Sequence, residues 1–160
     1  MGNLAFGGTG KTPFTELVVR LLSDEGFVPV ILSRGYRGIR DRDPLVVSNL
    51  HHVLEGPIAA GDEPFLLARR LPGVPVVVGR NRFEAGQLAL ERFPLHQFVL
   101  DDGFQHQRLH RDVDIVLLDA LEPWKRLRES PKALRRAHVI VLTRAQLADE
   151  DHLAATRKEI

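Results

Sequence analysis

The sequence predicts an α/β fold, a mostly parallel sheet with helices on both faces, and three observations predict it. Residues 5–12 read Ala-Phe-Gly-Gly-Thr-Gly-Lys-Thr, a phosphate-binding loop of the Walker A type. Short β-branched runs alternate in places with amphipathic helical patterns. Residues 98–102, Phe-Val-Leu-Asp-Asp, have the form of a Walker B strand. In such sheets ligands bind beyond the carboxyl ends of the strands, and the polar clusters of this sequence fall there.

The phosphate-binding loop carries Ala5 where the usual pattern has a first glycine. Its glycines let consecutive backbone N–H groups curl around a polyphosphate, Lys11 can reach the terminal phosphates, and the Thr12 hydroxyl can ligate Mg²⁺. An ordinary glycine-rich surface turn gives no reason for the Lys-Thr pair. The implied ligand is a nucleoside triphosphate, and the implied fold is P-loop NTPase-like. The residues predicted to hold the nucleotide are Gly7, Gly8, Thr9, Gly10, Lys11 and Thr12.

A helix is expected directly after the loop, over residues 12–25. Pro13 suits a first helical turn, and apolar residues from Phe14 to Leu22 repeat at the spacing of one buried face. Further helical patterns cover residues 62–71, 81–93 and 146–160. The strands predicted from β-branched runs cover residues 28–33, 45–47, 74–79, 97–101, 113–119 and 138–143.

Composition describes a soluble globular chain of one domain. The 160 residues are 44% hydrophobic and 27% charged, with a formal net charge of +1, which gives no reason to expect a nucleic-acid partner. The absence of cysteine excludes disulfides and thiolate metal sites. The apolar runs fall far short of the roughly 18 residues of a membrane span, and no signal peptide is present. Any membrane contact is therefore expected to be peripheral, or made by segments outside this sequence.

Both ends of the sequence look unfinished. Only residues 1–4 precede the phosphate-binding loop, too few for a full central strand of about five residues. At the other end, the helix expected over residues 146–160 has no strand after it. We therefore expect residues 1–160 to form a single nucleotide-binding domain that is truncated at both ends.

The paired carboxylates of Asp101 and Asp102 are predicted to face the Mg²⁺ that accompanies the nucleotide. The alternative is an acidic turn between a strand and a loop. Gly103 lets the chain turn sharply, and Gln105 and His106 then follow within reach of the same site. His106 could equally be an ordinary surface histidine.

Asp62 and Glu63 open the helix expected over residues 62–71, and two interpretations compete. In one, either carboxylate caps the helix while Pro64 fits the first turn, and spacing alone favours this account. In the other, a carboxylate fixed there takes a proton from an attacking hydroxyl or holds magnesium.

Arg34 follows the strand over residues 28–33, and Arg144 follows the last strand. A lone arginine is more often a solvated surface residue. The location that they share, at strand ends, favours a role in binding an anionic group.

Five motifs in order resemble the tetraacyldisaccharide 4'-kinase family of the lipid A pathway. The resemblance runs from Gly2 to about Arg144, and the segments over residues 78–82 and 109–112 match as well. The motifs are Gly2-Asn3-Leu4, Gly7-Gly8-Thr9-Gly10-Lys11-Thr12-Pro13, Ser33-Arg34-Gly35-Tyr36, Gly61-Asp62-Glu63-Pro64 and Asp101-Asp102-Gly103-Phe104-Gln105-His106.

The resemblance implies transfer of the γ-phosphate of ATP to the 4'-hydroxyl of a tetraacylated disaccharide 1-phosphate, at the cytoplasmic face of the bacterial inner membrane. By resemblance, Lys11 and Thr12 hold the phosphates and Mg²⁺, and Asp62 is the base that takes the proton of the sugar hydroxyl. This implication reverses the preference for Asp62 as a helix cap. The other residues to which the resemblance gives a role are Asp101, Asp102 and Glu63 at the metal, His106 in catalysis, and Arg34, Gln105 and Arg144 in support.

The sequence departs from the family in three ways. Members begin with a hydrophobic, membrane-associated segment and a first strand, and they continue into a second lobe with a histidine that partners the catalytic aspartate. Residues 123–131 also look shorter than the glycine- and proline-rich stretch usual there. We therefore expect the chain alone to be a soluble, weak nucleotide binder with little or no kinase activity.

Two alternatives to the kinase remain. A partitioning-type ATPase switch also carries Gly-Gly-x-Gly-Lys-Thr, but it has a second lysine directly before the paired glycines, where this chain has Phe6. The other alternative is a nucleotide-binding module without catalysis.

Overall fold

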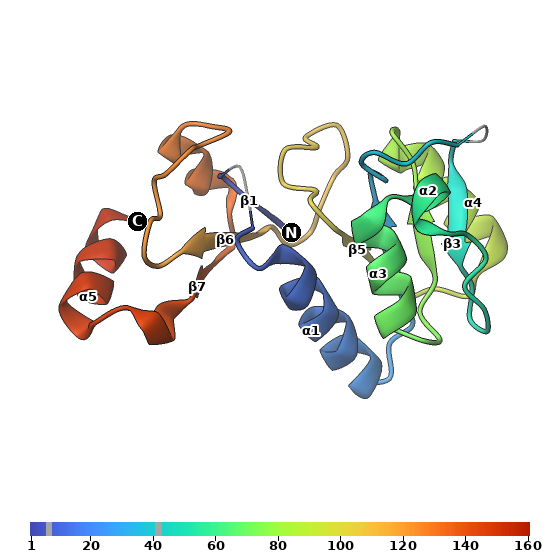
Figure 1. Ribbon diagram of the computed structural model, residues 1–160, viewed down its shortest axis with the longest axis horizontal. Helices are drawn as coiled ribbons and strands as arrows, with labels where there is room; N and C mark the ends of the chain where they lie inside the picture. Colours follow the sequence, from blue (N-terminus) through green and yellow to red (C-terminus); the bar gives the residue numbers. More distant parts are fainter. Residues whose placement is uncertain (6–7, 41–42) are drawn as a thin grey trace. The chain divides into compact units, whose positions relative to one another are not determined.

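The computed structural model describes residues 1–5, 8–40 and 43–160, which form two compact units. Unit 1 comprises Met1–Lys11 and Phe104–Ile160, and unit 2 comprises Thr12–Gly103. Helices and strands alternate along both units, which confirms the predicted α/β class (Figure 1). The single domain expected over residues 1–160 stays a prediction.

Unit 2 is built on a four-stranded sheet of order β3-β4-β2-β5. Its strands are β2 (Pro29–Ser33), β3 (Leu45–Ser48), β4 (Val76–Val78) and β5 (Gln97–Leu100). The central strand β2 pairs in parallel with both β4 and β5, whereas β3 runs antiparallel to β4. All five residues of β2 are buried, as expected for the middle of a sheet that is covered on both faces.

Helices cover both faces of the unit 2 sheet, as predicted. On one face, the glycine at position 86 in α4 (Arg82–Arg92) lies against Leu32 and Phe98. Asp101 lies three residues after Phe98, and residues an odd number apart along an extended strand point to opposite sides of the sheet. On that other face, Thr15 of α1 (Lys11–Asp24) donates a hydrogen bond to Asp101. The remaining helices of this unit are α2 (Pro57–Ala60) and α3 (Asp62–Arg70).

Unit 1 holds a second, wholly parallel sheet of order β1-β6-β7, so the described residues form two sheets where the sequence predicts one. β1 (Gly2–Asn3) pairs with β6 (Ile115–Asp119), which pairs with β7 (Val139–Thr143). Figure 1 shows β1, β6 and β7 together within this unit. β1 has only two residues, in keeping with the short segment that precedes the phosphate-binding loop.

The last helix begins later than predicted. Residues 145–147 form the 3₁₀ helix η2 (Ala145–Leu147), and α5 (Glu150–Glu159) follows. The reason is the side chain of Asp149, which accepts a hydrogen bond from the backbone N–H of His152 and so caps α5. A second 3₁₀ helix, η1 (Pro131–Arg136), precedes β7.

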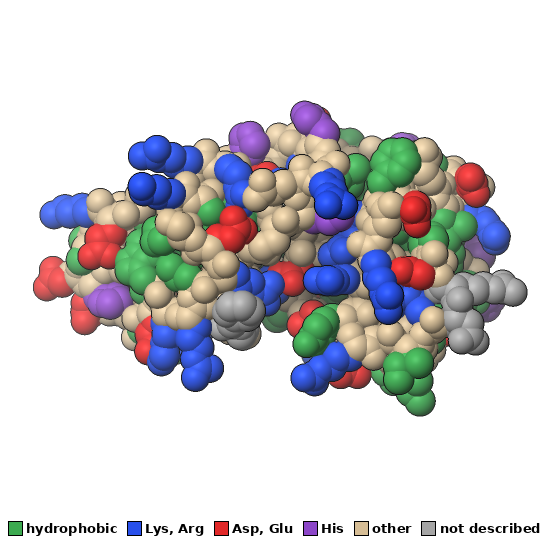
Figure 2. Space-filling view, turned by 90° about the horizontal axis from the view of Figure 1, so that it is seen from above, with side chains coloured by type: hydrophobic (Ala, Val, Ile, Leu, Met, Phe, Trp, Pro, Cys, Tyr) green, Lys and Arg blue, Asp and Glu red, His purple; other side chains and the backbone are tan. Residues whose placement is uncertain are grey.

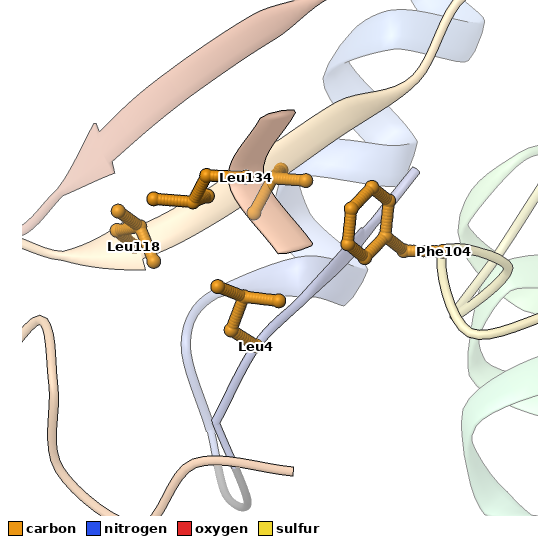
Figure 3. Packing of buried hydrophobic residues seen from close by; sticks show 5 residues of the cluster. Leu4, Phe104, Leu118 and Leu134 are labelled. Carbon is orange, nitrogen blue, oxygen red and sulfur yellow. The ribbon is translucent and has the colours of Figure 1, made fainter. Parts of the chain in front are cut away.

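A small apolar core holds unit 1 together. The side chains of Leu4, Phe104, Leu118 and Leu134 converge in Figure 3, and Val116 completes the cluster. Leu4 directly precedes the phosphate-binding loop, and Phe104 comes two residues after the paired aspartates. A Cβ atom on Gly2 would lie 2.7 Å from the Phe104 Cβ, so glycine is what allows β1 to approach this segment. The core therefore anchors the strand before the loop and the segment that follows the aspartates.

Over the described ranges, no helix combines the length and the apolar character that crossing a bilayer requires.

Candidate functional site

The predicted site residues are divided between the two units. Gly7 lies outside the described residues, as does Phe6, on which the comparison with partitioning ATPases depends. Unit 1 contains Gly8, Thr9, Gly10, Lys11, Gln105, His106 and Arg144. Unit 2 contains Thr12, Arg34, Asp62, Glu63, Asp101 and Asp102.

The phosphate-binding loop is held in unit 1 by a buried amide. Asn3 is fully buried, and its Nδ2 donates a hydrogen bond of 2.7 Å to the Thr9 hydroxyl. Gly10 has a φ of +78°, a conformation that glycine adopts readily and other residues rarely do. Lys11 then begins α1, one residue earlier than predicted. Sequence reasoning missed Asn3 as a site residue, although it is part of the first quoted motif.

Gln105 supports the same loop through Asn3. Its Nε2 donates a hydrogen bond of 2.7 Å to the backbone carbonyl of Asn3. Among the described residues, the two side-chain oxygens of this pair, Asn3 Oδ1 and Gln105 Oε1, are buried without a hydrogen-bond partner. The structure shows that Gln105 contacts the strand before the loop. Its predicted supporting role toward the substrate stays a prediction.

The loop around His106 is fixed by an arginine clamp. The guanidinium of Arg111 donates to the backbone carbonyls of His106 and Leu109, and its Nε and Nη2 bind the two carboxylate oxygens of Asp114 at 2.7 and 3.1 Å. Two parallel charged hydrogen bonds make this ion pair geometrically specific. The clamp defines the backbone path of the loop, and the catalytic role of His106 stays a prediction.

A cavity of about 300 Å³ lies in unit 1 next to the phosphate-binding loop. Arg144 lies just after β7, as predicted, and its guanidinium pairs with Asp119 at the end of β6. Arg144 has a φ of +57°, so its backbone is left-handed. The residues that line the cavity are Ala5, Gly8, Thr9, Asp119, Glu122, Lys125, Arg126 and Arg144.

In unit 2, Asp101 is the buried acceptor at the end of β5. Its two carboxylate oxygens accept hydrogen bonds from the Thr15 hydroxyl at 3.0 Å and the Ser33 hydroxyl at 3.3 Å, and only 1% of the residue is exposed. Thr12 lies one turn before Thr15 on α1, and residues three apart share a helix face. Thr12 is therefore on the face of α1 that carries the hydrogen bond to Asp101. Asp102, with a φ of +48°, turns the chain after the strand.

Asp62 and Glu63 are the first two residues of α3, and both are exposed. The N-cap residue is Gly61, which has no side chain, so the interpretation in which Asp62 or Glu63 is the cap residue is wrong. Gly61 has a φ of +89°, and a Cβ on it would lie 2.5 Å from the backbone oxygen of Tyr36. This close approach brings the start of α3 against the segment that carries Arg34.

Arg82 is a buried cation that sequence reasoning did not identify as a site residue. It is 4% exposed, and its Nη1 donates to the backbone carbonyls of residues 79 and 80. Burial lowers the pKa of Arg82, and the positive charge of Arg34 lowers it further. Asp102, Asp101 and Asp43 act in the opposite direction and favour the charged guanidinium. The only sequence signal was its place within the matching segment over residues 78–82.

The donor set of the predicted metal site fits magnesium. The described residues contain no group of three or more histidines and carboxylates that could hold a metal ion by themselves. Mg²⁺ commonly takes one or two carboxylates together with phosphate oxygens and waters, so a threonine hydroxyl and the two aspartates are a suitable protein contribution. Figure 2 shows basic side chains interspersed with acidic ones on the face drawn, in keeping with the near-neutral net charge.

Three comparisons with known proteins agree. The family model described as tetraacyldisaccharide-1-P 4'-kinase, LpxK, matches residues 1–160. Tetraacyldisaccharide 4'-kinase of Syntrophus aciditrophicus is 47% identical over 152 residues, which cover 89% of this chain and 41% of that protein. The corresponding figures for tetraacyldisaccharide 4'-kinase of Geobacter metallireducens are 45% identity, 93% of this chain and 46% of that protein.

A solved structure shows the same likeness. The crystal structure of LpxK from Aquifex aeolicus in complex with ATP matches with a TM-score of 0.84 and 43% identity. The match covers 91% of this chain and 47% of that chain. This chain therefore spans less than half the length of the relatives that it matches.

Proposed function

This chain belongs to the tetraacyldisaccharide-1-P 4'-kinase family, and from that premise we propose that the protein transfers the γ-phosphate of ATP to the 4'-hydroxyl of a tetraacyldisaccharide 1-phosphate. The family relatives bear this activity in their names, and the solved relative was crystallised with ATP. The reaction is a step of lipid A biosynthesis.

One observation carries the proposal beyond the family name. The hydrogen bond from Thr15 to Asp101 connects the first turns of α1, which begin in the phosphate-binding motif, to the carboxylate that directly follows β5. A P-loop kinase requires this association, because the metal and phosphate ligands of the two motifs serve the same nucleotide.

The nucleotide is proposed to be held by backbone N–H groups of the loop and by Lys11. The Thr12 hydroxyl and the carboxylates of Asp101 and Asp102 would hold Mg²⁺, which neutralises charge on the phosphates when bound. The Lys11 ammonium offsets negative charge on the terminal phosphate, and this charge is most in need of stabilisation as phosphoryl transfer proceeds. Glu63 is proposed as a further carboxylate near the metal, and Arg34 and Arg144 as cations that contact the substrates.

Asp62 is proposed as the base. The oxygen of the 4'-hydroxyl forms a bond to the γ-phosphorus, and the bond from that phosphorus to the bridging oxygen of ADP breaks. The proton of the hydroxyl passes to the Asp62 carboxylate, and the electron pair of the broken bond remains with ADP. Asp62 is exposed and is not the N-cap residue of α3, so its carboxylate does not have the capping role that spacing alone suggested.

The substrate chemistry also defines the proposed location. A tetraacylated disaccharide is held in a bilayer by its acyl chains, so an enzyme that phosphorylates it works at a membrane surface. We assign the protein to the cytoplasmic face of the bacterial inner membrane, with peripheral contact to the bilayer.

The proposed function is tested by following label from [γ-³²P]ATP in the presence of Mg²⁺ and the acceptor in detergent micelles. In a version of the protein extended to the length of its relatives, we expect label in the lipid, dependent on the acceptor and on Mg²⁺, and lost in Lys11→Ala. Residues 1–160 alone are expected to give little or no label. Lys132→Ala, which removes an exposed lysine of η1, is the matched control and should retain the activity of the wild type.

Other outcomes would overturn the kinase proposal. Release of inorganic phosphate at a rate that is independent of the acceptor, with no labelled lipid, would indicate an ATPase switch. Binding of Mg-ATP with neither lipid labelling nor hydrolysis would indicate a nucleotide-binding module.

A further inference from the structure

The cavity of unit 1 borders the phosphate-binding loop but contains side chains that neither motif includes. Its volume of about 300 Å³ lies at the lower end of the range of small-molecule sites. Gly8 and Thr9 form one part of its lining, and the segment with Lys125 and Arg126 forms another. Arg144 comes from a third segment, so the cavity offers backbone and side-chain groups of three separate segments to one ligand.

Three cationic side chains line the cavity, and two of them form ion pairs with carboxylates of the same lining. The Lys125 ammonium lies 2.6 Å from the Glu122 carboxylate, and the Arg144 guanidinium pairs with Asp119. In the part of the chain that the structure describes, Arg126 has no such ion pair, although it lines the same cavity. The surplus positive charge of the lining is thus the guanidinium of Arg126, which favours an anionic ligand there.

The backbone holds Arg126 in a defined place. Leu127 forms an antiparallel bridge with Ala5, and the N–H of Arg128 donates a hydrogen bond of 2.5 Å to the carbonyl of Leu4. Arg126 therefore directly precedes the residues that pair with the start of the phosphate-binding loop. Its φ is +49°, a left-handed conformation that residues other than glycine adopt uncommonly and that recurs at ligand-binding sites.

We propose that Arg126 binds a phosphate group of a substrate in this cavity, next to Gly8 and Thr9. A guanidinium suits this task because its planar set of N–H donors matches phosphate oxygens. The phosphate is either the terminal phosphate of ATP or the 1-phosphate of the acceptor. The inference rests on the proposed function only for the identity of these two ligands.

The test compares the wild type with Arg126→Gln, Arg126→Lys and the control Arg135→Gln, which removes an exposed cation of η1 outside the cavity. Binding is followed by the fluorescence of Trp124, the single tryptophan of the chain, which lies two residues from Arg126. One arm measures dissociation constants for Mg-ATP, Mg-ADP and adenosine. The other arm measures binding of acceptor micelles with and without the 1-phosphate.

In the nucleotide arm, Arg126→Gln should weaken Mg-ATP binding by about tenfold, the loss expected for one charged hydrogen bond. Binding of Mg-ADP should weaken less, binding of adenosine should not change, and Arg126→Lys should recover part of the lost affinity for Mg-ATP. If the acceptor supplies the phosphate, the variant should instead weaken only the acceptor that carries the 1-phosphate. Arg135→Gln should match the wild type in both arms.

The inference is overturned if Arg126→Gln equals the wild type in both arms, or weakens adenosine as much as ATP. If the wild type binds neither Mg-ATP nor the acceptor, the proposed function fails. The inference about Arg126 is then decided by measuring the binding of tripolyphosphate. A fluorescence change with tripolyphosphate that is lost in Arg126→Gln would uphold it, whereas no change in the wild type would overturn it.

Discussion

At the residue scale, Asn3 connects the strand before the phosphate-binding loop to the loop itself. Its amide donates to Thr9, and its backbone carbonyl accepts from Gln105, so one buried residue carries contacts to both segments. Loss of a hydrogen bond to a buried polar group costs about 1–3 kcal/mol, because the remaining partner cannot recover its bond to water.

Asn3→Ala should therefore weaken Mg-ATP binding, since Thr9 and the loop around it lose their fixed position. We expect a dissociation constant raised by about tenfold, measured by calorimetry. The matched control is Asn49→Ala, which removes a side chain that accepts from the backbone of residues 51 and 52 in a turn of unit 2. Equal affinities of Asn3→Ala and the wild type would show that the amide does not position the loop.

The second prediction at this scale concerns Asp62. Asp62→Asn removes the proposed base but keeps the size of the side chain, so Mg-ATP binding should be retained while phosphoryl transfer falls by about 10²-fold or more. The two quantities are measured separately, as a dissociation constant and as kcat, in a version of the protein extended to the length of its relatives. Asp24→Asn, an exposed carboxylate at the end of α1, should alter neither. Unchanged transfer in Asp62→Asn would withdraw the role of base.

At the element scale, the start of α3 depends on a glycine. Gly61 has φ and ψ of 89° and 156°, a region that only glycine occupies readily. Its α-carbon also approaches the backbone of Tyr36, which a side chain could not do without displacing that segment.

Gly61→Ala should lower the free energy of unfolding by about 1–3 kcal/mol for backbone strain, and by more because of the clash with Tyr36. Urea denaturation followed by circular dichroism measures the change. Gly73→Ala is the control, because Gly73 also has a positive φ, of 86°, but a Cβ there would meet no described atom within 4 Å. A loss in Gly61→Ala no larger than in Gly73→Ala would contradict the close packing of the two segments.

A second prediction at this scale concerns α1. The hydrogen bond from Arg20 lowers the pKa of the Glu16 carboxyl below its ordinary value of 4.5, and the charges of Arg20 and Arg70 act in the same direction against desolvation. Because the pKa is lower in the folded state, the ionised carboxylate stabilises the fold above the pKa of the unfolded state. This contribution disappears as the pH falls through the lower, folded pKa.

Glu16→Gln should therefore lower the Tm slightly at pH 7 and have no effect at a pH where the wild-type carboxyl is protonated in both states. Thermal unfolding across this pH range measures the difference. Glu25→Gln, an exposed residue just beyond α1, should follow the wild-type curve at each pH. A Tm difference for Glu16→Gln that does not depend on pH would exclude the ion pair as its cause.

Periodicity predicted most of the longer elements, because most of them bury at least one face, as β2 and β4 bury all their residues. It did not predict the short helix α2. The boundaries followed local hydrogen bonds instead. Asn81 caps α4 and Asp149 caps α5, so these two helices begin one and four residues after their expected starts. The site was predictable where a motif has a fixed order of residues, as in the loop and the paired aspartates. The contacts of Asn3 with Gln105 and the burial of Arg82 arise from packing between distant segments, which no local pattern records.

At the scale of the whole molecule, the chain passes from unit 1 to unit 2 between Lys11 and Thr12 and returns between Gly103 and Phe104. Both junctions fall within the motifs that are proposed to serve one nucleotide. A ligand that binds only the folded state adds to stability by mass action, about 2.7 kcal/mol at a concentration 100 times its dissociation constant. Mg-ATP should therefore raise the Tm of the chain, and Lys11→Ala should abolish the increase.

The central claim is that one Mg-ATP contacts both the phosphate-binding loop and the paired aspartates. An experimental structure of the chain with Mg²⁺ and a non-hydrolysable ATP analogue tests it most directly. The account predicts a terminal phosphate oxygen within about 3 Å of Lys11 Nζ and a metal about 2.1 Å from Thr12 Oγ1, with Asp101 or Asp102 bound to that metal directly or through one water. A nucleotide bound at Lys11 and Thr12, with both aspartates on the far side of the molecule, would contradict it.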